Sequence, residues 1–299
     1  MNPVLAVDFG GTKIEAALVV DGVLIPGTRF RETTGAVKTA AELDDAVRSV
    51  VTQALGDRTV TAVGIGSAGP VDASRGVVSP LNVPAWRDHP LVPLVATLVP
   101  DVPITLAIDG LAIALAEHRY GAGRGAKNLL GMVVSTGVGG GLVLDGRGFA
   151  GTTGNAGHIG HIEVAGFTDA CPCGGYGCLE AIASGPSAVR WAQANGWAGS
   201  TGEELGTAAS SDAADPVARA AIERSARAVG QALASATGLL DLDVIAIGGG
   251  FSHSAPDYLD LVRAEFTGRL WEFVTKVRIV PAGLGNEAPL IGAALLTEQ

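Results

Sequence analysis

Cysteine is scarce in this sequence. The 299-residue chain has three cysteines, all between residues 171 and 178. An odd number of cysteines packed so closely excludes a disulfide framework, so we expect the protein to fold around hydrophobic cores in a reducing, cytoplasmic compartment. The N-terminus carries neither a positively charged region nor a cleavage site, and we expect no targeting segment.

Charged residues are also few, at 17% of the chain, and positive charge is the scarcer sign. Lysine and arginine number 20 against 30 aspartate and glutamate residues, giving a net charge of −10. This balance argues against nucleic acid or an anionic membrane as a partner. No apolar run reaches membrane-spanning length without a charge or glycine, so no membrane partner is expected. With 47% hydrophobic residues, the chain can bury one or two large cores.

Glycine, by contrast, is abundant, with 43 residues gathered in clusters. The clusters lie at residues 10–11, 64–69, 137–141, 174–177 and 248–250. Short apolar, β-branched runs at 4–7, 60–65, 132–134 and 244–247 accompany four of them and predict strands. A strand followed by a glycine turn is the usual form of a ligand-binding loop in α/β proteins.

Helical periodicity fills the intervals between these strands. It predicts helices over residues 39–55, 215–239, 254–271 and 288–298. Thr39 and Glu42 have the spacing of a capping box, and Asp215-Pro216 is a strong helix start. The alternation of strands and helices predicts an α/β fold.

A short internal repeat suggests two similar domains. The apolar runs on either side of Asp21-Gly22 and of Asp145-Gly146 each predict a β-hairpin, and each hairpin follows a glycine-rich turn. We therefore expect two α/β domains facing a ligand cleft. The smaller would comprise residues 1–107 and 289–299, and the larger residues 108–288.

Three glycine clusters combine with polar groups that suit a nucleotide. Asp8 in the Asp8-Phe-Gly-Gly-Thr-Lys13 stretch could hold Mg²⁺ while backbone N–H groups face phosphate oxygens. The spacing is not that of a Walker A loop. One such cluster alone is more often a tight turn, but three together favour an ATP and Mg²⁺ site. The predicted residues are Asp8, Gly10, Gly11, Thr12, Lys13, Thr136, Gly137, Gly139, Gly248, Gly249 and Gly250.

The three cysteines follow a histidine at metal-site spacing. His161, Cys171, Cys173 and Cys178 supply one imidazole and three thiolates, a complete tetrahedral zinc site. The alternative, three free buried cysteines, is disfavoured by their spacing within eight residues. A zinc ion held by four protein ligands is structural, so we assign it to shaping a neighbouring loop.

These motifs resemble the ROK family of bacterial sugar kinases and repressors, as does the segment from Gly151 to Glu180. The resemblance covers essentially the whole chain. It implies the two-domain, actin-like ATPase fold, a small-molecule sugar and ATP as partners, and a homo-oligomer, either dimer or tetramer. Repressor members carry a DNA-binding segment before the first strand, and this chain begins at that strand, so the kinase branch is expected.

The resemblance also assigns a sugar pocket. The predicted substrate residues are Ser67, Gly69, Asn82, Asp109, His158, His161 and Glu180. Asp109 taken alone is a helix cap, but in the family the aspartate at this place is the catalytic base that takes the proton of the sugar 6-hydroxyl. The expected activity is ATP-dependent phosphorylation of a hexose or N-acetylhexosamine of the glucose or N-acetylmannosamine type.

Two positions depart from the family pattern. Ile108 stands where the family usually has asparagine, and His158 stands where it usually has glutamate. These departures leave open a second hypothesis, a sugar sensor with little or no turnover. A third hypothesis, an unrelated ATPase such as a chaperone, is disfavoured by the short chain and the cysteine cluster.

Overall fold

The computed structural model describes residues 3–211, 213–267 and 276–299. By its internal contacts the chain forms two compact units. Unit 1 comprises Met1–Arg124, Gly141–Gly157 and Leu284–Gln299, and unit 2 comprises Gly125–Gly140 and His158–Gly283. Within the described part of the chain, no helix is long and apolar enough to cross a membrane.

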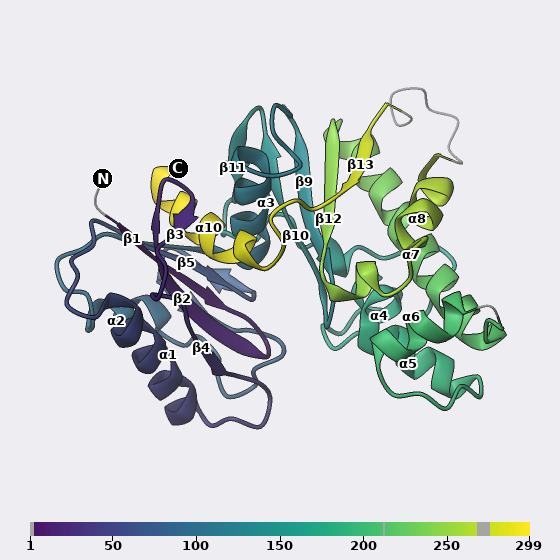
Figure 1. Ribbon diagram of the computed structural model, residues 1–299, viewed down its shortest axis with the longest axis horizontal. Coiled ribbons are helices and arrows are strands. Elements are labelled where there is room, and N and C mark those ends of the chain that lie inside the picture. The colour runs from purple at the N-terminus through teal and green to yellow at the C-terminus, as the bar shows by residue number, and fades with distance from the viewer. Residues whose placement is uncertain (1–2, 212, 268–275) are drawn as a thin grey trace. The chain divides into compact units, whose positions relative to one another are not determined.

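A six-stranded sheet forms the centre of unit 1 (Figure 1). Its main path runs β3-β2-β1-β5-β8, and β4 pairs with β2. The strands are β1 Val4–Phe9, β2 Lys13–Val20, β3 Val23–Leu24, β4 Phe30–Thr33, β5 Val63–Ser67 and β8 Ile104–Ile108. Because β1, β5 and β8 are parallel neighbours, their carboxyl ends meet at one edge of the sheet.

The other large sheet repeats this order of strands as β11-β10-β9-β12-β13. Its strands are β9 Leu129–Val134, β10 Val138–Leu144, β11 Arg147–Phe149, β12 Val244–Gly248 and β13 Arg278–Pro281. Strand β10 begins in unit 2 and ends in unit 1. Asp21-Gly22 and Asp145-Gly146 form the two predicted hairpin turns, each with positive φ at both positions.

Helices cover both faces of the first sheet (Figure 1). Helix α1 (Ala40–Leu55) lies on one side, and α10 (Ala288–Leu295) and α3 (Asp109–Arg119) pack on the other. Helices α3 and α10 approach so closely that a Cβ atom on Gly292 would lie 1.8 Å from the Ala112 carbonyl oxygen. A glycine is therefore required at this crossing.

Helix α7 (Pro216–Leu240) is the central helix of unit 2. Around it pack α4 (Leu179–Ala183), α5 (Gly185–Ala194), α6 (Gly202–Ser210) and α8 (Tyr258–Thr267). The remaining elements are α2 Leu91–Ala96, the small hairpin β6 Val71–Asp72 with β7 Val77–Val78, and 3₁₀ turns at Ile159–His161, Gly250–His253, Gly285–Glu287 and Leu296–Glu298.

The predicted helix over 254–271 begins too early. Helix α8 starts at Tyr258, because the Ser252 and Ser254 hydroxyls donate to the Gly249 and Phe251 carbonyls at 2.8 Å and hold this stretch in a 3₁₀ turn. Residues 268–271 of the prediction lie outside the described residues.

The compact units and the predicted domains are divided differently. Helix α3 and the β10–β11 turn group with unit 1, whereas the sequence prediction placed them after its boundary at residue 108. The predicted division into residues 1–107 with 289–299 and residues 108–288 stays a prediction about where the domains divide.

Candidate functional site

The β1–β2 turn carries the first group of predicted nucleotide residues. Asp8 lies near the end of β1 and only 6% of its surface is exposed. Gly10, Gly11 and Thr12 form the turn, which closes through a 2.8 Å bond from the Gly10 N–H to the Lys13 carbonyl. Thr34 holds the turn from the side, because its hydroxyl donates to the Gly10 carbonyl at 2.8 Å.

Asp8 belongs to a row of charged groups on one face of the sheet. It pairs across the strands with Glu15, whose carboxylate is 1% exposed and contacts Lys13, Arg29 and Arg31. Burial, and then the Asp109 carboxylate, raise the pKa of Asp8 from 3.8 to about 7, against the opposing effect of Lys13. Such a perturbed carboxylate is a marker of a functional site.

Two further predicted residues lie at the neighbouring strand ends in the same unit. Asp109 follows β8 and is the first residue of α3; the cap position itself belongs to Ile108, which is buried. One Asp109 carboxylate oxygen accepts a 2.7 Å bond from the Gly110 N–H. Ser67, at the end of β5, is fully buried and donates to the Ala68 carbonyl at 3.0 Å.

A loop after β7 brings Asn82 to the β1–β2 turn. A Cβ atom on Gly11 would lie 3.1 Å from the Asn82 Cβ atom, so the asparagine packs directly on the predicted phosphate turn. The base of this loop is tied to Gly69, whose carbonyl accepts a 3.3 Å bond from the Leu81 N–H. Unit 1 thus brings Asp8, Gly69, Asn82 and Asp109 into one neighbourhood.

The other predicted nucleotide turns adjoin one another in unit 2. The turn after β9 contains Thr136 and Gly137, and Gly139 is the second residue of β10. Gly248 ends the neighbouring strand β12, and Gly249 and Gly250 follow it. Gly249 has φ +94°, and a Cβ atom there would lie 2.5 Å from the Val134 carbonyl oxygen. Only glycine allows the two backbones to approach so closely.

A cavity of about 250 Å³ adjoins the Gly248–Gly250 turn. It is lined by Ser252, His253, Ala255, Pro256, Leu259, Asp260, Arg263 and Pro281. This predicted nucleotide turn therefore has a concave surface beside it, the usual shape of a small-molecule site.

Glu180 and His158, two predicted sugar ligands, also lie in unit 2. Glu180 is in the first turn of α4, and its Oε2 accepts a 2.9 Å bond from the N–H of Val138, the first residue of β10. His158 precedes the 3₁₀ turn that ends at His161, and the two imidazole centroids are 6.1 Å apart.

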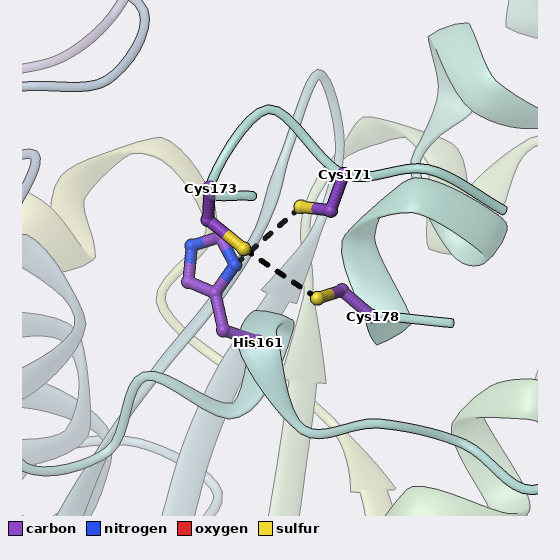
Figure 2. A group of neighbouring side chains, drawn as sticks. All are labelled: His161, Cys171, Cys173 and Cys178. Carbon is purple, nitrogen blue, oxygen red and sulfur yellow. Dashed lines mark hydrogen bonds between the residues drawn. The ribbon is translucent and has the colours of Figure 1, made fainter. Parts of the chain in front are cut away.

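The predicted metal ligands form one cluster (Figure 2). The ligand atoms of His161, Cys171, Cys173 and Cys178 all lie within 4.8 Å of one another. Cys171 Sγ is 3.7 Å from His161 Nδ1, and Cys173 Sγ is 3.6 Å from Cys178 Sγ. Neighbouring ligands of a tetrahedral zinc ion lie about 3.5–3.8 Å apart, given Zn–S and Zn–N bonds of about 2.3 and 2.0 Å.

The chemistry of the cluster also fits a cation. Burial first, and then the neighbouring thiols, raise the pKa of Cys178 to about 12. Buried thiols at this separation resist ionisation unless a metal ion neutralises the thiolates. The four residues therefore fit a zinc ion in both spacing and donor type.

Sequence reasoning missed several groups that surround the predicted residues. Glu15 follows Lys13 by two positions and so shares its face of the strand, a periodicity that could have identified it. Arg31 lies in β4 and Arg29 directly precedes that strand, so both contact Glu15 only because β4 pairs with β2. No local sequence pattern predicts this pairing.

Comparison with known proteins supplies the family. The profile described as "ROK family" matches residues 4–299. This chain belongs to the ROK family. The N-acetylmannosamine kinase of Vibrio cholerae is 34% identical to it over 97% of each chain.

Two solved ROK structures are similarly close. A ROK hexokinase from Thermus thermophilus is 35% identical, with a TM-score of 0.84 over 98% of this chain and 97% of the other. A ROK family glucokinase from Streptomyces griseus, solved in complex with glucose and AMPPNP, is 34% identical, with the same TM-score over 98% of each chain. The implied two-domain, actin-like ATPase fold is therefore confirmed for this ROK protein.

Proposed function

We propose that this ROK protein is an ATP-dependent kinase that phosphorylates the 6-hydroxyl of a hexose or N-acetylhexosamine. The observation that carries the proposal is the pair of carboxylates at the strand ends of unit 1. Asp8, beside the glycine turn of β1, and Asp109, after β8, lie close enough for each charge to be felt by the other. Family membership and the kinases among its relatives support the same activity.

The proposed step divides the roles between these carboxylates. Asp109 accepts the proton of the sugar 6-hydroxyl while that oxygen forms a bond to the γ-phosphorus, and the bond from phosphorus to the β,γ-bridging oxygen breaks to release ADP. Asp8 would hold Mg²⁺, which offsets the phosphate charge when bound. The backbone N–H groups of the Gly10–Thr12 turn are suited to orient phosphate oxygens.

The remaining nucleotide assignments belong to the same proposal. Thr136, Gly137 and Gly139 would face phosphates from the turn between β9 and β10 and the start of β10, and Gly248, Gly249 and Gly250 would approach the adenosine. Both turns end parallel strands of unit 2, where α/β proteins bind ligands.

We further propose a structural zinc ion at His161, Cys171, Cys173 and Cys178. Four protein ligands leave no open position for catalysis, so the ion would fix the 158–180 segment, which carries His158 and Glu180. His161 Nδ1 faces Cys171, which leaves its other ring nitrogen for a sugar hydroxyl.

The choice of sugar depends on the two departures from the family pattern. Ile108 removes a polar group expected beside Asp109, and His158 replaces an acceptor-only carboxylate with an imidazole that can donate. A histidine at this place resembles N-acetylmannosamine kinases, whereas the Asn82-Val-Pro-Ala-Trp86 segment resembles the glucokinase branch. Both sugars therefore belong in the first test.

A coupled ADP-release assay over glucose, mannose, N-acetylglucosamine and N-acetylmannosamine tests the proposal. We expect turnover that depends on both Mg²⁺ and one of these sugars. Calorimetric binding of a sugar without ADP release would instead support the alternative of a sensor. ADP release that is independent of every sugar would contradict both.

The assembly and location follow from the family resemblance alone. We propose a cytoplasmic dimer or tetramer that acts on its small molecules without nucleic acid or membrane. Light scattering after gel filtration measures the mass of the assembly, and a monomer at micromolar concentration would contradict this part.

A further inference from the structure

The loop that carries Asn82 is held in shape before any sugar binds. It spans residues 79–90, between β7 and α2, and its two ends are joined by paired bonds between Val78 and His89, each 3.0 Å long. Inside it, two tight turns form through 3.1 Å bonds, from the Val83 N–H to the Pro80 carbonyl and from the Trp86 N–H to the Val83 carbonyl. Asn82 lies exposed within the first turn.

One arginine closes both turns at once. Nη1 of Arg87 lies 2.9, 3.0 and 2.6 Å from the carbonyl oxygens of Pro80, Val83 and Trp86, and its two hydrogens are shared among these three acceptors. The Pro80 and Val83 carbonyls are the acceptors that close the first and second turns. Trp86 is the last residue of the second turn. A cation that gathers three carbonyls opposes every opening of the loop, because each opening would leave the charge with fewer acceptors.

A stack of rings fixes this closed loop to the sheet. Trp86 is fully buried between Phe9 and His89, with ring centroids 4.3 and 4.0 Å away and nearly parallel planes. Phe9 directly follows Asp8, and His89 Nε2 is 3.1 Å from an Asp44 carboxylate oxygen on α1. The loop is thereby tied to β1, beside the proposed catalytic carboxylates, and to α1.

We propose that Arg87 is a positioning residue for the sugar substrate: it holds the 79–90 loop in its binding shape so that Asn82 meets the sugar without a cost of ordering. The proposal rests on the proposed function, in which Asn82 contacts the sugar. The hydrogen bonds of the Arg87 side chain within the described part of the chain go to backbone carbonyls of its own loop, so its effect on the sugar passes through Asn82. Loss of such preorganisation weakens binding because ordering is then paid during the binding step.

The test compares Arg87→Met and Arg87→Lys with Arg75→Met. Methionine keeps the length of the side chain without a donor, and lysine keeps the charge without the planar guanidinium. Arg75 is a matched control, since it is an exposed arginine whose ion pairs, within the described residues, go to the carboxylates of Asp72 and of Asp88 in the same loop, at 3.8 and 3.4 Å, and not to the loop's backbone carbonyls. Exposed pairs of this kind contribute little.

We expect Arg87→Met to raise the KM for the best sugar roughly tenfold, with kcat and the KM for ATP within about threefold of wild type. The reason for this split is that sugar binding itself restores the loop shape, so the bound complex reacts normally. The sugar KM of Arg87→Lys should lie between those of wild type and Arg87→Met. The sugar KM of Arg75→Met should equal that of wild type. An unchanged sugar KM in Arg87→Met, or an equal rise in both KM values, would overturn the proposal.

Failure of the proposed function gives a different result. If wild type phosphorylates no sugar but binds one, the calorimetric sugar affinity replaces KM, with the same tenfold loss expected for Arg87→Met. A wild type that neither binds nor phosphorylates any sugar overturns both proposals. If Arg87→Met does not fold, Arg87→Lys and Arg87→Gln, which each keep a donor, decide the question by the same measurement.

Discussion

At the scale of single residues, the most informative group is the buried carboxylate of Asp8. Asp8 lies opposite Glu15 across the β1–β2 pair and also interacts with the charge of Asp109. Two neighbouring negative charges therefore repel the Asp8 carboxylate. Burial and then these two carboxylates raise the pKa of Asp8, and Lys13 and Arg29 offset only part of that increase. Binding a cation would relieve the repulsion, which is why a functional carboxylate is expected to destabilise the unliganded fold.

We predict that Asp8→Asn stabilises the protein at pH 8 in the absence of added Mg²⁺. The pKa of Asp8 is raised from 3.8 to about 7, so its destabilising effect is absent below pH 3.8, grows as the pH rises, and is complete above about pH 7. The gain in melting temperature should therefore be larger at pH 8 than at pH 5. Asp45→Asn, at an exposed position on α1, is the control and should change little at either pH.

We predict that Asp109→Asn lowers kcat by about 10²–10⁴-fold and leaves ATP binding intact. The amide has the shape of the carboxylate and can still accept the 2.7 Å bond from the Gly110 N–H, so the start of α3 should persist. It cannot take the proton of the hydroxyl. Turnover in the ADP-release assay near the wild-type rate would show that Asp109 only serves the helix start.

Residue identity could be predicted where the residue's chemistry is local. The clustering of His161 with the three cysteines needed only their spacing, and the capping box of Thr39 and Glu42 forms as predicted. The charge network around Asp8 could not be predicted, because Arg29 and Arg31 reach Glu15 only after β2 and β4 have paired. Ser67, predicted as a sugar ligand, is fully buried, and sequence carries no signal for that.

At the scale of elements, the segment from 158 to 180 has little regular structure of its own. It contains one 3₁₀ turn and two isolated β-bridges, Glu163 with Cys178 and Ala170 with Tyr176. Arg224 of α7 secures it from outside through Asp169, with bonds of 2.7 and 2.6 Å to the two carboxylate oxygens. The proposed zinc ion would make the cysteine cluster a second anchor for this segment.

We predict one zinc ion per chain in protein purified without chelator, and its loss in Cys173→Ser. Metal binding stabilises such segments, so the variant should lose roughly several kcal/mol of local stability. This loss should appear as faster hydrogen exchange over residues 158–180. Its sugar KM should rise more than its ATP KM. Pro172→Ala, an exposed non-ligand in the same turn, should keep the zinc; zinc-free wild type with full activity would contradict the prediction.

The elements themselves were largely predictable, and the exceptions have physical causes. Strand β12 and the starts of α1 and α7 match their predictions because caps and apolar periodicity are local. Strand β5 begins at Val63 and not at residue 60. Its register is set by parallel pairing with β1, where Leu5 lies opposite Val63, and pairing partners are invisible in a single stretch of sequence.

At the scale of the whole molecule, two sheets with the same strand order carry the same arrangement of turns. The repeat of the two Asp-Gly hairpins anticipated this duplication. The division of the chain into compact units was harder to foresee, since β10 belongs to both units and α3 groups with unit 1. Such long-range assignments depend on which surfaces pack together, and a one-dimensional pattern carries little of that information.

Net charge leads to the last prediction, at this same scale. The whole chain carries −10, whereas near Asp8 the three cations Lys13, Arg29 and Arg31 are nearly balanced by Asp8, Glu15 and Asp109. The local field therefore contributes little to steering, and repulsion between the acidic protein and the MgATP anion should dominate its approach. Salt screens this repulsion, so kcat/KM for ATP should rise roughly two- to threefold between about 10 and 150 mM NaCl. The kcat/KM for the sugar, which is uncharged, is the internal control and should stay constant over the same range of salt. A fall in kcat/KM for ATP would instead mean that Lys13, Arg29 and Arg31 attract the nucleotide more strongly than the whole molecule repels it.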